Sequence, residues 1–546
     1  MESKLAMGNA NTSSIAIESA GTIDSDPDIA ILRANGHESV LKRQFNWFSA
    51  LALGFTITNS WVGYLSCVGQ SLVYGGPQVG LFGLIIAFVA QSLVTVGLSE
   101  IASAFPSTGG QYHFCYILSP QNNKRFAAYI IGWMSTIAWW VVTCSGVSLA
   151  AVSIAGIIHF FDPDYSAKQW HIYLFYVAVA TITSLSYRPK PLKQHSPVPT
   201  VIPVFVASKR LAWVVQFSLA LSVLGFFLWL FTAAGMHTHT QAPSFLVDSG
   251  LHTSGWSQGT SWVLGIANCM YAFGGTDGAI HISEEIPQPG RRVPQVIAMT
   301  LIMGLLTSLP LMVVLFYFMH DLDAVIHSPL PSLELIYQAT GNKNVTLFLV
   351  IWLLMVYIMS LPSQWVTCGR MAWAFARDNG IPASKYFSHI DNRLEFPVRT
   401  TIAAFVFVCL YGLLYLASTT AFNSIITSAV LFLNITYSVP QGILLLRGRK
   451  KALPPRYLNL GRLGYLCNGF AVLWVVVLAV FICMPPQLPV EVGSMNYTSV
   501  VTAGLLVIVL LMWTFSGRHQ FEGPHINWEL LKVANVEFLE KIHHQD

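Results

Sequence analysis

Charge is scarce in this sequence, because only 10% of its 546 residues are Asp, Glu, Lys or Arg. Soluble domains carry about 25% charged residues, so a water-soluble protein is excluded. Hydrophobic residues make up 54% of the chain, and the mean hydropathy is +0.57. The small net charge of +4 gives no reason to expect a nucleic-acid partner.

Patterns of catalysis and metal binding are missing as well. The eight cysteines lie in or beside apolar runs, without the spacing of a disulfide framework or a metal site. No G-x-x-x-x-G-K-[ST] loop occurs, so no ATPase within the chain is expected. There is also no H-E-x-x-H or G-x-S-x-G element. We therefore expect neither an enzyme nor a resident metal or cofactor.

What the sequence does have is long apolar runs. A helix needs roughly 20 apolar residues to cross a bilayer, and twelve runs qualify, which predicts an all-α membrane protein with 12 transmembrane helices. We expect one twelve-helix membrane domain (47–516), a disordered N-terminal tail (1–46) and a C-terminal tail (517–546). The runs are 47–72, 79–104, 127–158, 170–187, 211–234, 260–282, 295–319, 345–368, 399–417, 421–446, 465–484 and 497–516.

The positive charges predict how these helices are oriented. Lys and Arg collect in cytoplasmic loops. With the N-terminus inside, all but two of the 29 Lys and Arg residues fall in predicted inner segments, and the exceptions are Lys168 and Lys343. A change of one in the number of spans would destroy this alternation. We therefore predict a multi-pass membrane protein with both termini in the cytoplasm, and no apolar signal-peptide region precedes the first run.

Two of the runs are interrupted by glycines and polar residues. The first contains LGFTITNSWVGYLSC (53–67), and the sixth contains YAFGGTDGAI (271–280). Irregular backbone at membrane depth is tolerated where it is buried in protein or lines a wet cavity. The two breaks are five crossings apart, so these helices enter from opposite faces, which indicates a secondary transporter with a midplane site. The alternative is that the glycines merely allow close helix packing.

Asp277 stands at the second break. A carboxylate at bilayer depth costs at least roughly 2.5–3.5 kcal/mol, so we expect it to face a cavity and to have a partner. Asp277, His281 and Glu284 are spaced i, i+4 and i+7, which places them on one helix face. This stripe suits a cationic substrate, a proton or both. Glu284 also lies close to Arg291 and Arg292, which favours a structural pairing.

Aromatic residues cluster near both breaks. Trp61 and Tyr64 follow the first, and Tyr271 and Phe273 precede the second. Cation–π attraction contributes roughly 2 kcal/mol to holding a desolvated quaternary ammonium group. The alternative for each ring is ordinary packing. Trp139, in the third run, faces either the cavity or lipid.

Charged residues also stand at the predicted inner ends of two runs. Glu100 ends the second run, and Arg370, Arg377 and Asp378 end the eighth. They would form either an inner gate of ion pairs or a set of solvated interface charges.

Four segments together resemble a known family. They are SEIASAFPSTGGQYHF (99–114), DGAIHISEEIPQPGRRVP (277–294), DLDAVI (321–326) and FARDNGIP (375–382). They resemble the fungal amino acid/choline transporter family of the amino acid–polyamine–organocation (APC) superfamily, closest to its choline and 4-aminobutyrate permeases. ITNSWVG (57–63) and LLYLASTTAFNSIITSAVLFLNITYSVP (413–440) are most similar to the choline permeases. The resemblance covers about residues 40–520.

This resemblance implies a five-plus-five inverted repeat (LeuT-like) plus two C-terminal helices, with substrate held where helices 1 and 6 are broken. It also implies import of a nitrogenous solute at the plasma membrane, commonly with protons. Asp277 and His281 would then contact the substrate and a proton, respectively, and Glu284 is a second candidate for proton coupling. With the aromatic residues, the predicted substrate site is Thr58, Asn59, Ser60, Trp61, Gly63, Tyr64, Tyr271, Phe273, Gly274, Gly275, Thr276 and Asp277.

The expected function is thus a permease for choline, 4-aminobutyrate or another amino acid. A nutrient sensor or an exporter of a pathway metabolite is the alternative. One segment departs from the family pattern, because residues 186–210 insert a basic, proline-rich stretch between the fourth and fifth runs. This stretch is either a genuine cytoplasmic loop or a translated intron.

Overall fold

The computed structural model describes residues 27–36, 41, 43–184, 211–417, 419–490 and 495–543. These residues form helices joined by loops and turns, with no β-strand beyond one isolated bridge between Asp391 and Phe396. The prediction of an all-α protein is confirmed for this part of the chain. The predicted disorder of residues 1–26 and the two interpretations of the 186–210 insertion lie outside the described residues.

The helices follow one another along the chain. Those of the first half are α2 (Pro27–Ala34), α3 (Trp47–Thr58), α4 (Ser60–Ala104), α5 (Gln111–Leu118), α6 (Lys124–Phe161), α7 (Gln169–Ser184), α8 (Leu211–Met236), the 3-10 helix η2 (Pro243–Val247) and α9 (Gln258–Cys269). Then come the 3-10 helices η3 (Met270–Phe273) and η4 (Thr276–Glu285), followed by α10 (Pro289–Tyr317), α11 (Leu322–His327), α12 (Pro331–Thr340), α13 (Lys343–Arg377) and α14 (Ser384–Phe387). The remainder are α15 (Val398–Gly412), α16 (Leu414–Ala417), α17 (Thr419–Arg447), α18 (Arg449–Ala452), α19 (Leu463–Phe481), α20 (Thr498–Met512), the π-helical turn η6 (Trp513–Gly517), α21 (Arg518–Gln520) and α22 (Trp528–His543).

Nine helices among the described residues are long and apolar enough to cross a membrane. The first of them, Trp47–Ala104, contains two predicted runs, which are separated by a turn at Gly75 and Gly76 just before Pro77. The nine therefore correspond to ten of the twelve predicted runs. The fourth run begins as α7, whose end borders the undescribed segment. The sixth run is divided among α9, η3 and η4, so no continuous helix represents it.

Both predicted helix breaks are present. Asn59 separates α3 from α4 because its backbone is left-handed (φ 36°, ψ 57°). Asn visits this conformation more readily than most residues because its short side chain can hydrogen-bond locally. In the sixth run, η3 ends before Gly274, and Gly275 has a φ of 76°. The helical conformation is thus interrupted at one residue between α3 and α4 and at two residues between η3 and η4.

Gly275 is expected to tolerate no side chain. A Cβ atom there would lie 2.8 Å from Cγ2 of Ile57, and a left-handed conformation costs an L-residue roughly 1–2 kcal/mol. We therefore expect Gly275→Ala to lower the stability of the purified protein by at least about 1–2 kcal/mol, measured by thermal unfolding in detergent.

Gly235 in α8 provides the control, since a Cβ atom there would meet nothing within 4 Å. Gly235→Ala should be neutral or should stabilise by up to about 1 kcal/mol, because alanine is the better helix former. Equal shifts in the melting temperatures of the two variants would contradict this account of the break.

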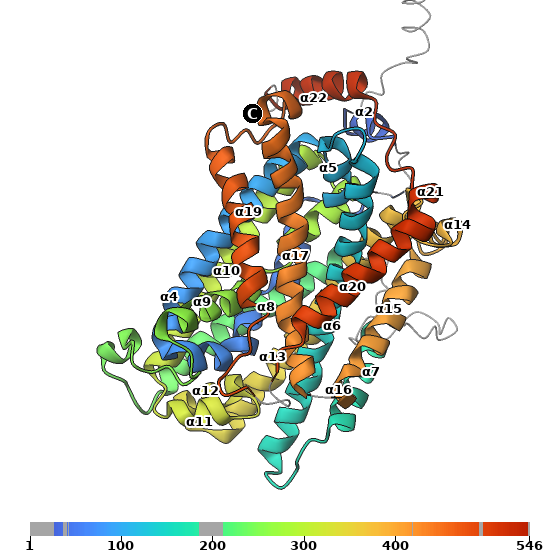
Figure 1. Ribbon diagram of the computed structural model, residues 1–546. Coiled ribbons are helices and arrows are strands. Elements are labelled where there is room, and N and C mark those ends of the chain that lie inside the picture. The colour runs from blue at the N-terminus through green and yellow to red at the C-terminus, as the bar shows by residue number, and fades with distance from the viewer. Residues whose placement is uncertain are drawn as a thin grey trace, which may run out of the picture.

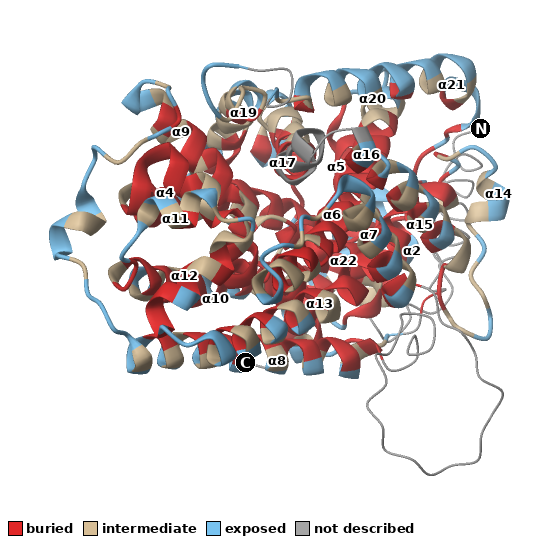
Figure 2. Cartoon of the chain, turned by 90° about the horizontal axis from the view of Figure 1, so that it is seen from below, coloured by how far each residue is buried: buried red, intermediate tan, exposed pale blue. Residues whose placement is uncertain are grey.

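The long helices pack side by side into one bundle (Figure 1). Buried residues fill its centre, and exposed residues occupy its margin, as along α8 and α20 (Figure 2). Many of the exposed residues are large and apolar, which suits a surface that faces lipid. Examples are Phe231, Leu306, Leu410, Leu473 and Val507.

Helices from both ends of the chain pack together at one end of the bundle, where α2 and α22 lie near α5 (Figure 1). The Asn527 N–H donates to the Ala34 carbonyl (2.7 Å), and the side chain of Asn35 donates to the Pro106 carbonyl (3.1 Å). The Asn535 side chain donates to the Ala104 carbonyl (3.3 Å). The prediction of a disordered N-terminal tail is therefore wrong for residues 27–36, because tertiary packing orders a helix too short to be stable alone.

Candidate functional site

A small cavity lies at the two helix breaks. Its volume is about 50 Å³, and one water molecule needs roughly 10–15 Å³, so the walls close around the space of a few waters. α3, α4, α6, α13 and α17 all contribute to its lining. The predicted substrate residues that line it are Thr58, Asn59, Gly63, Tyr271 and Gly274.

The other predicted substrate residues are buried but do not line this cavity. The Trp61 indole donates to Oγ of Ser222 (3.0 Å), and the Tyr64 hydroxyl donates to the Gly80 carbonyl (2.6 Å). The ring of Phe273 packs edge-on against a phenylalanine of α4. The other four predicted residues lie at or directly after the two helix breaks: Ser60, Gly275, Thr276 and Asp277.

Three helices supply lining residues that the sequence did not predict. On α13, Tyr357, Ser360 and Gln364 are spaced i, i+3 and i+7 and so share one face. The sequence signal that could have indicated this face is Pro362, which is flanked by polar residues within an apolar run. Such a combination occurs both in functional helices of membrane proteins and in helices that merely pack against others. On these three helices the unpredicted lining residues are Val142, Ser145, Gly146 and Leu149 of α6, Tyr357, Ser360 and Gln364 of α13, and Ala429, Val430 and Leu433 of α17. Thr56, Ile57 and Val62, beside the first break, also line the cavity and were not predicted.

The cavity presents two polar atoms without a hydrogen-bond partner among the described residues. They are Oγ1 of Thr58 and Oε1 of Gln364, and both are buried. Asn59, by contrast, has a partner at both side-chain polar atoms: its amide donates to Oγ of Ser360 (3.1 Å), and its oxygen accepts from Ser222 (2.7 Å). An unmade buried hydrogen bond costs about 1–3 kcal/mol, so these two oxygens are the natural contacts for a ligand with hydrogen-bond donors or positive charge.

The Asp277 carboxylate is the centre of a separate polar cluster. Its Oδ2 accepts from Nε2 of Gln111 (2.6 Å) and from the Trp139 indole (3.3 Å). Its Oδ1 accepts from the Tyr437 hydroxyl (2.5 Å). These partners come from α5, α6 and α17. The expectation that Asp277 has partners is confirmed, and Trp139 faces this cluster rather than lipid.

His281 completes the cluster and constrains where protons lie. Its Nδ1 is 3.0 Å from the Thr108 carbonyl, and its Nε2 is 3.1 Å from Oδ2 of Asp277. A carbonyl only accepts, so Nδ1 must carry a hydrogen. The second contact is attractive only if another proton lies between Nε2 and the carboxylate. The buried His281–Asp277 pair thus shares one proton and is electrically neutral.

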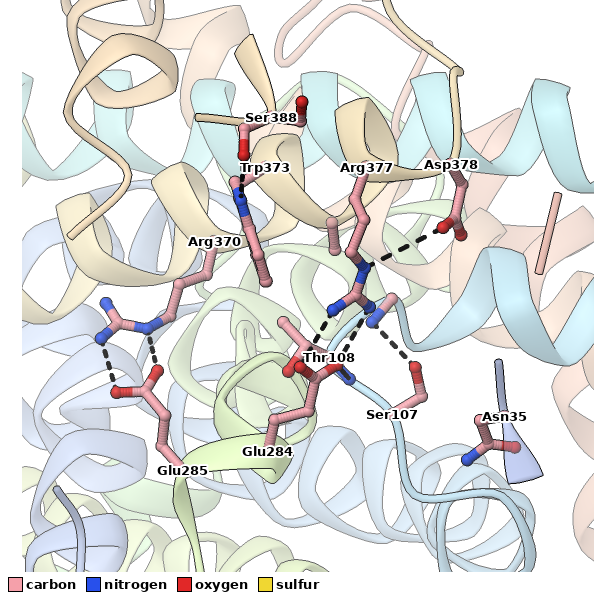
Figure 3. Close-up of polar contacts among 12 residues, drawn as sticks. Asn35, Ser107, Thr108, Glu284, Glu285, Arg370, Trp373, Arg377, Asp378 and Ser388 are labelled. Atoms are coloured by element: carbon pink, nitrogen blue, oxygen red, sulfur yellow. Dashed lines mark hydrogen bonds and ion pairs between the residues drawn. The ribbon is translucent and has the colours of Figure 1, made fainter. Parts of the chain in front are cut away.

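Ion pairs link η4 to α13 (Figure 3). Glu284 holds Arg377 through two bonds of 3.0 Å, and Glu285 holds Arg370 through two bonds, of which Nη2 to Oε2 measures 2.7 Å. Both side chains of the Glu285–Arg370 pair are fully buried. These residues therefore form a buried ion-pair cluster and not a set of solvated interface charges.

α5 extends this cluster through Asp378. The Tyr112 hydroxyl (2.8 Å) and Nε2 of His113 (2.7 Å) both contact Oδ2 of Asp378, and Arg377 lies 3.9 Å from its other oxygen. Gln111, next to Tyr112, contacts Asp277. The first turn of α5 thus connects the proton-sharing pair with the ion-pair cluster.

Glu100 belongs to a second charged cluster. Its buried carboxylate pairs with Arg449 and with Arg456 (2.5 Å), and it accepts from the Leu460 N–H (3.2 Å). This cluster fastens the end of α4 to α18 and to the segment that follows it.

An apolar helical bundle with a small cavity, lined in part by polar residues, at two interrupted helices defines a class of protein, the membrane transporters with broken helices. Comparison of the sequence with family models gives the family: the chain belongs to the amino acid permeases, whose model matches residues 45–186 and 200–508. The resemblance to APC permeases seen in the sequence is thereby confirmed. The match leaves out residues 187–199, which lie inside the proline-rich insertion.

Several curated relatives carry more specific names. The choline transporter of Saccharomyces cerevisiae is 30% identical over 487 residues, which cover 88% of this chain and 83% of that protein. The 7-keto 8-aminopelargonic acid transporter of the same yeast is 26% identical over 549 residues, covering 89% and 94%. The swainsonine transporter of Arthroderma benhamiae is 27% identical over 520 residues, covering 93% and 97%. All three relatives are named as transporters.

Proposed function

We propose that this permease imports a small organic cation of the choline type together with protons, by alternating access, at the plasma membrane. Its architecture would be the twelve-helix bundle with a five-plus-five inverted repeat and both termini in the cytoplasm. The observation that carries the choice of substrate class is the electrostatic character of the cavity, which contains no ionised side chain among the described residues that line it.

Helix ends supply the charge that a cation needs. α3 ends at Thr58, and the α9–η3 segment ends at Phe273, directly before Gly274. Thr58 and Gly274 both line the cavity. The C-terminal end of a helix carries roughly half a negative charge, so two such ends together match one positive charge. The unpartnered oxygens of Thr58 and Gln364 add to the same potential.

A substrate carboxylate finds less support at the same place. The N–H groups of Val62 and Gly63, in the first turn after the break, both donate to the Asn59 carbonyl (2.9 Å each). The residues at the start of η4 do not line the cavity. A choline-like cation is therefore favoured over an amino acid, in line with the name of the yeast choline transporter.

Gln364 is expected to contact the substrate. Gln364→Leu removes the acceptor oxygen available to the hydroxyl of a choline-like substrate, and a buried donor left without a partner costs about 1–3 kcal/mol. We therefore expect a KM for uptake at least about 5-fold higher, with a similar amount of protein at the cell surface. Gly146→Ala should also raise the KM for uptake, because a Cβ atom there would lie 2.4 Å from Oε1 of Gln364 and would displace it. The control is Gln258→Leu, at the exposed start of α9, and an equal effect there would contradict the assignment.

A second cavity provides a route to the substrate site. It has a volume of about 460 Å³ and shares Leu149 with the small cavity. Ser66 and Cys67 also line it, one helical turn beyond Gly63, and it reaches His327 at the end of α11. The charge distribution predicts that this side faces outward. At the opposite end, the ion pairs of Glu284 and Glu285 close the bundle, as alternating access requires of an outward-accessible state.

The proton that Asp277 and His281 share supports proton coupling. Both side chains are buried in the described structure, and they belong to η4, directly after the broken segment. Movement of η4 would change the access of this proton to water. Glu284 is better assigned to the ion-pair cluster than to proton transfer, because Arg377 occupies both of its carboxylate oxygens.

The experiment that tests this function is uptake in a yeast strain without its own choline and 4-aminobutyrate permeases. The full chain is expressed, and uptake of labelled choline, 4-aminobutyrate and other amino acids is measured at acidic and neutral external pH. Saturable choline uptake that increases at acidic pH is the expected result. Amino-acid uptake alone would overturn the cation assignment. Absence of uptake with the protein at the cell surface would instead favour a sensor or an exporter.

A further inference from the structure

Helix α22 packs at one end of the bundle (Figure 1). A large groove lies there, lined in part by residues 524–528. Its volume is about 860 Å³, and it is separate from both cavities of the proposed transport path. Three segments distant in sequence form its walls: the end of α5 with the loop to α6, the end of α17, and the segment before α22. The lining residues are 116–121, 123, 124, 443, 446, 447 and 524–528.

The groove is basic. Lys124, Arg447 and His525 line it, and no acidic residue is present in its described lining. Helix α6 also begins there, at Lys124, and no side chain caps its first turn, so the positive end of its dipole adds to the potential. A carboxylate contacts one of these lining residues: Oε2 of Glu522 lies 3.6 Å from Nε2 of His525, and both side chains are largely exposed.

One side of the groove is apolar and faces outward from the bundle. Ile443 and Leu446 of α17 line it, and Leu446 is 92% exposed. Trp528 and Tyr116 provide aromatic walls near its rim, the residue types that favour the headgroup level of a membrane. A soluble anion would leave this apolar wall unused, whereas a lipid has a phosphate for the cations and acyl chains for the wall.

We propose that this groove binds the headgroup of an anionic glycerophospholipid from the cytoplasmic leaflet. Lys124, Arg447 and the start of α6 would contact its phosphate, while its acyl chains would lie along α17 beside Leu446. Basic pockets between helices on the cytoplasmic side of membrane proteins bind lipids of this kind. Because His525 directly precedes α22 and Trp528 begins it, a bound lipid would also fasten the C-terminal helix to the bundle. This proposal is independent of the transported substrate.

The geometry leaves Lys124 and Arg447 in different roles. Lys124 lies over the ring of Tyr116, with its Nζ 4.7 Å from the ring centre. Arg447 donates from Nη1 to the Ile117 carbonyl (2.5 Å), which leaves its other nitrogens for a phosphate. Removing Arg447 therefore affects both the lipid and a structural contact, whereas removing Lys124 spares that contact. A variant that retains Arg447 is needed beside one that does not.

The test is lipid binding by the purified full chain. Detergent-solubilised protein is titrated with phosphatidylserine, phosphatidylinositol or phosphatidylcholine, and bound lipid is counted by native mass spectrometry. We expect both anionic lipids to bind more tightly than phosphatidylcholine. Affinity should fall about five-fold for each cation removed, so Lys124→Gln should weaken binding about five-fold and Lys124→Gln with Arg447→Gln about 25-fold. Lys124→Gln with His525→Ala keeps the Arg447 contact and should still bind more weakly than the parent.

Lys450 and Lys451 provide the matched control. Both are exposed on α18 at the same end of the chain's membrane domain and do not line the groove. Lys450→Gln with Lys451→Gln should leave the bound lipid unchanged. Equal losses in this control and in the groove variants would overturn the proposal in favour of general surface attraction. Competition of inorganic phosphate or inositol phosphate as strong as that of whole lipid would overturn the lipid assignment and leave a site for soluble anions.

Discussion

Asp277→Asn is expected to lower proton-driven uptake roughly 10- to 100-fold while the protein still reaches the cell surface. The substitution removes the carboxylate that shares a proton with His281. A hydrogen bond to a charged group contributes about 1.5–3 kcal/mol, which corresponds to that range of rates or affinities. The measurement is uptake of labelled substrate in the same yeast strain, corrected for the amount of protein at the surface.

The hydrogen bonds explain why folding should survive this change. The new amide oxygen can still accept from the Tyr437 hydroxyl, and the new amide nitrogen can donate to a neutral His281 whose Nδ1 keeps its bond to the Thr108 carbonyl. Gln111 can turn its own amide to match. Only the Trp139 indole loses its partner, because its N–H can donate a hydrogen bond but cannot accept one. The cluster therefore keeps its shape but loses its exchangeable proton.

Asp323 supplies the control for this prediction, because it is an exposed aspartate in the first turn of α11. Asp323→Asn should leave uptake close to that of the parent. Uptake by Asp277→Asn that still rises at acidic external pH as it does in the parent would contradict the assignment of the proton to the Asp277–His281 pair.

The helix breaks and the apolar spans were predictable because they depend on local chemistry. Asn59 and Gly275 are residue types that accept a left-handed backbone, and lipid does not tolerate an irregular polar stretch inside an apolar run unless protein or a cavity surrounds it. Hydropathy alone likewise marked the runs, since each must satisfy its own backbone within the bilayer. These features do not require knowledge of which helices are neighbours.

The walls of the site were not predictable because they depend on which helices pack together. Gln111, Trp139 and Tyr437 reach Asp277 from three different helices, and each of them also fits ordinary packing or capping. Gln364 looked like one polar residue in an apolar helix. For the same reason, the sequence placed Trp61 and Tyr64 in the pocket, although both find their hydrogen-bond partners elsewhere.

The disorder predicted for the N-terminal tail failed over α2 for a related reason. The segment PDIAILRA is short, and an isolated helix of this length is not stable in water. Its apolar residues Ile31 and Ala34 become buried only after the distant α22 packs against them. Sequence patterns considered one segment at a time do not contain such a contact.

The buried pair of Arg370 and Glu285 should have the largest effect on stability. Both side chains are fully buried, and removing one partner of a buried ion pair costs about 3–5 kcal/mol because the other charge stays behind unpaired. Total stabilities are only about 5–15 kcal/mol. We therefore expect Arg370→Met and Glu285→Met to leave little folded protein, measured by thermal unfolding and size-exclusion profiles of solubilised membranes.

The double substitution distinguishes this cause from a simple loss of packing. With both charges replaced by methionine no unpaired charge remains, and such replacements are often neutral or stabilising, so folded protein should reappear. Arg377→Met is the matched comparison two turns further along α13, where the arginine side chain is 16% exposed and that of Glu284 is 4% exposed, so this pair lies nearer to water than the fully buried one. Its cost should be smaller than that of Arg370→Met. If the double variant is as unstable as the single ones, the pair acts through shape and not through charge.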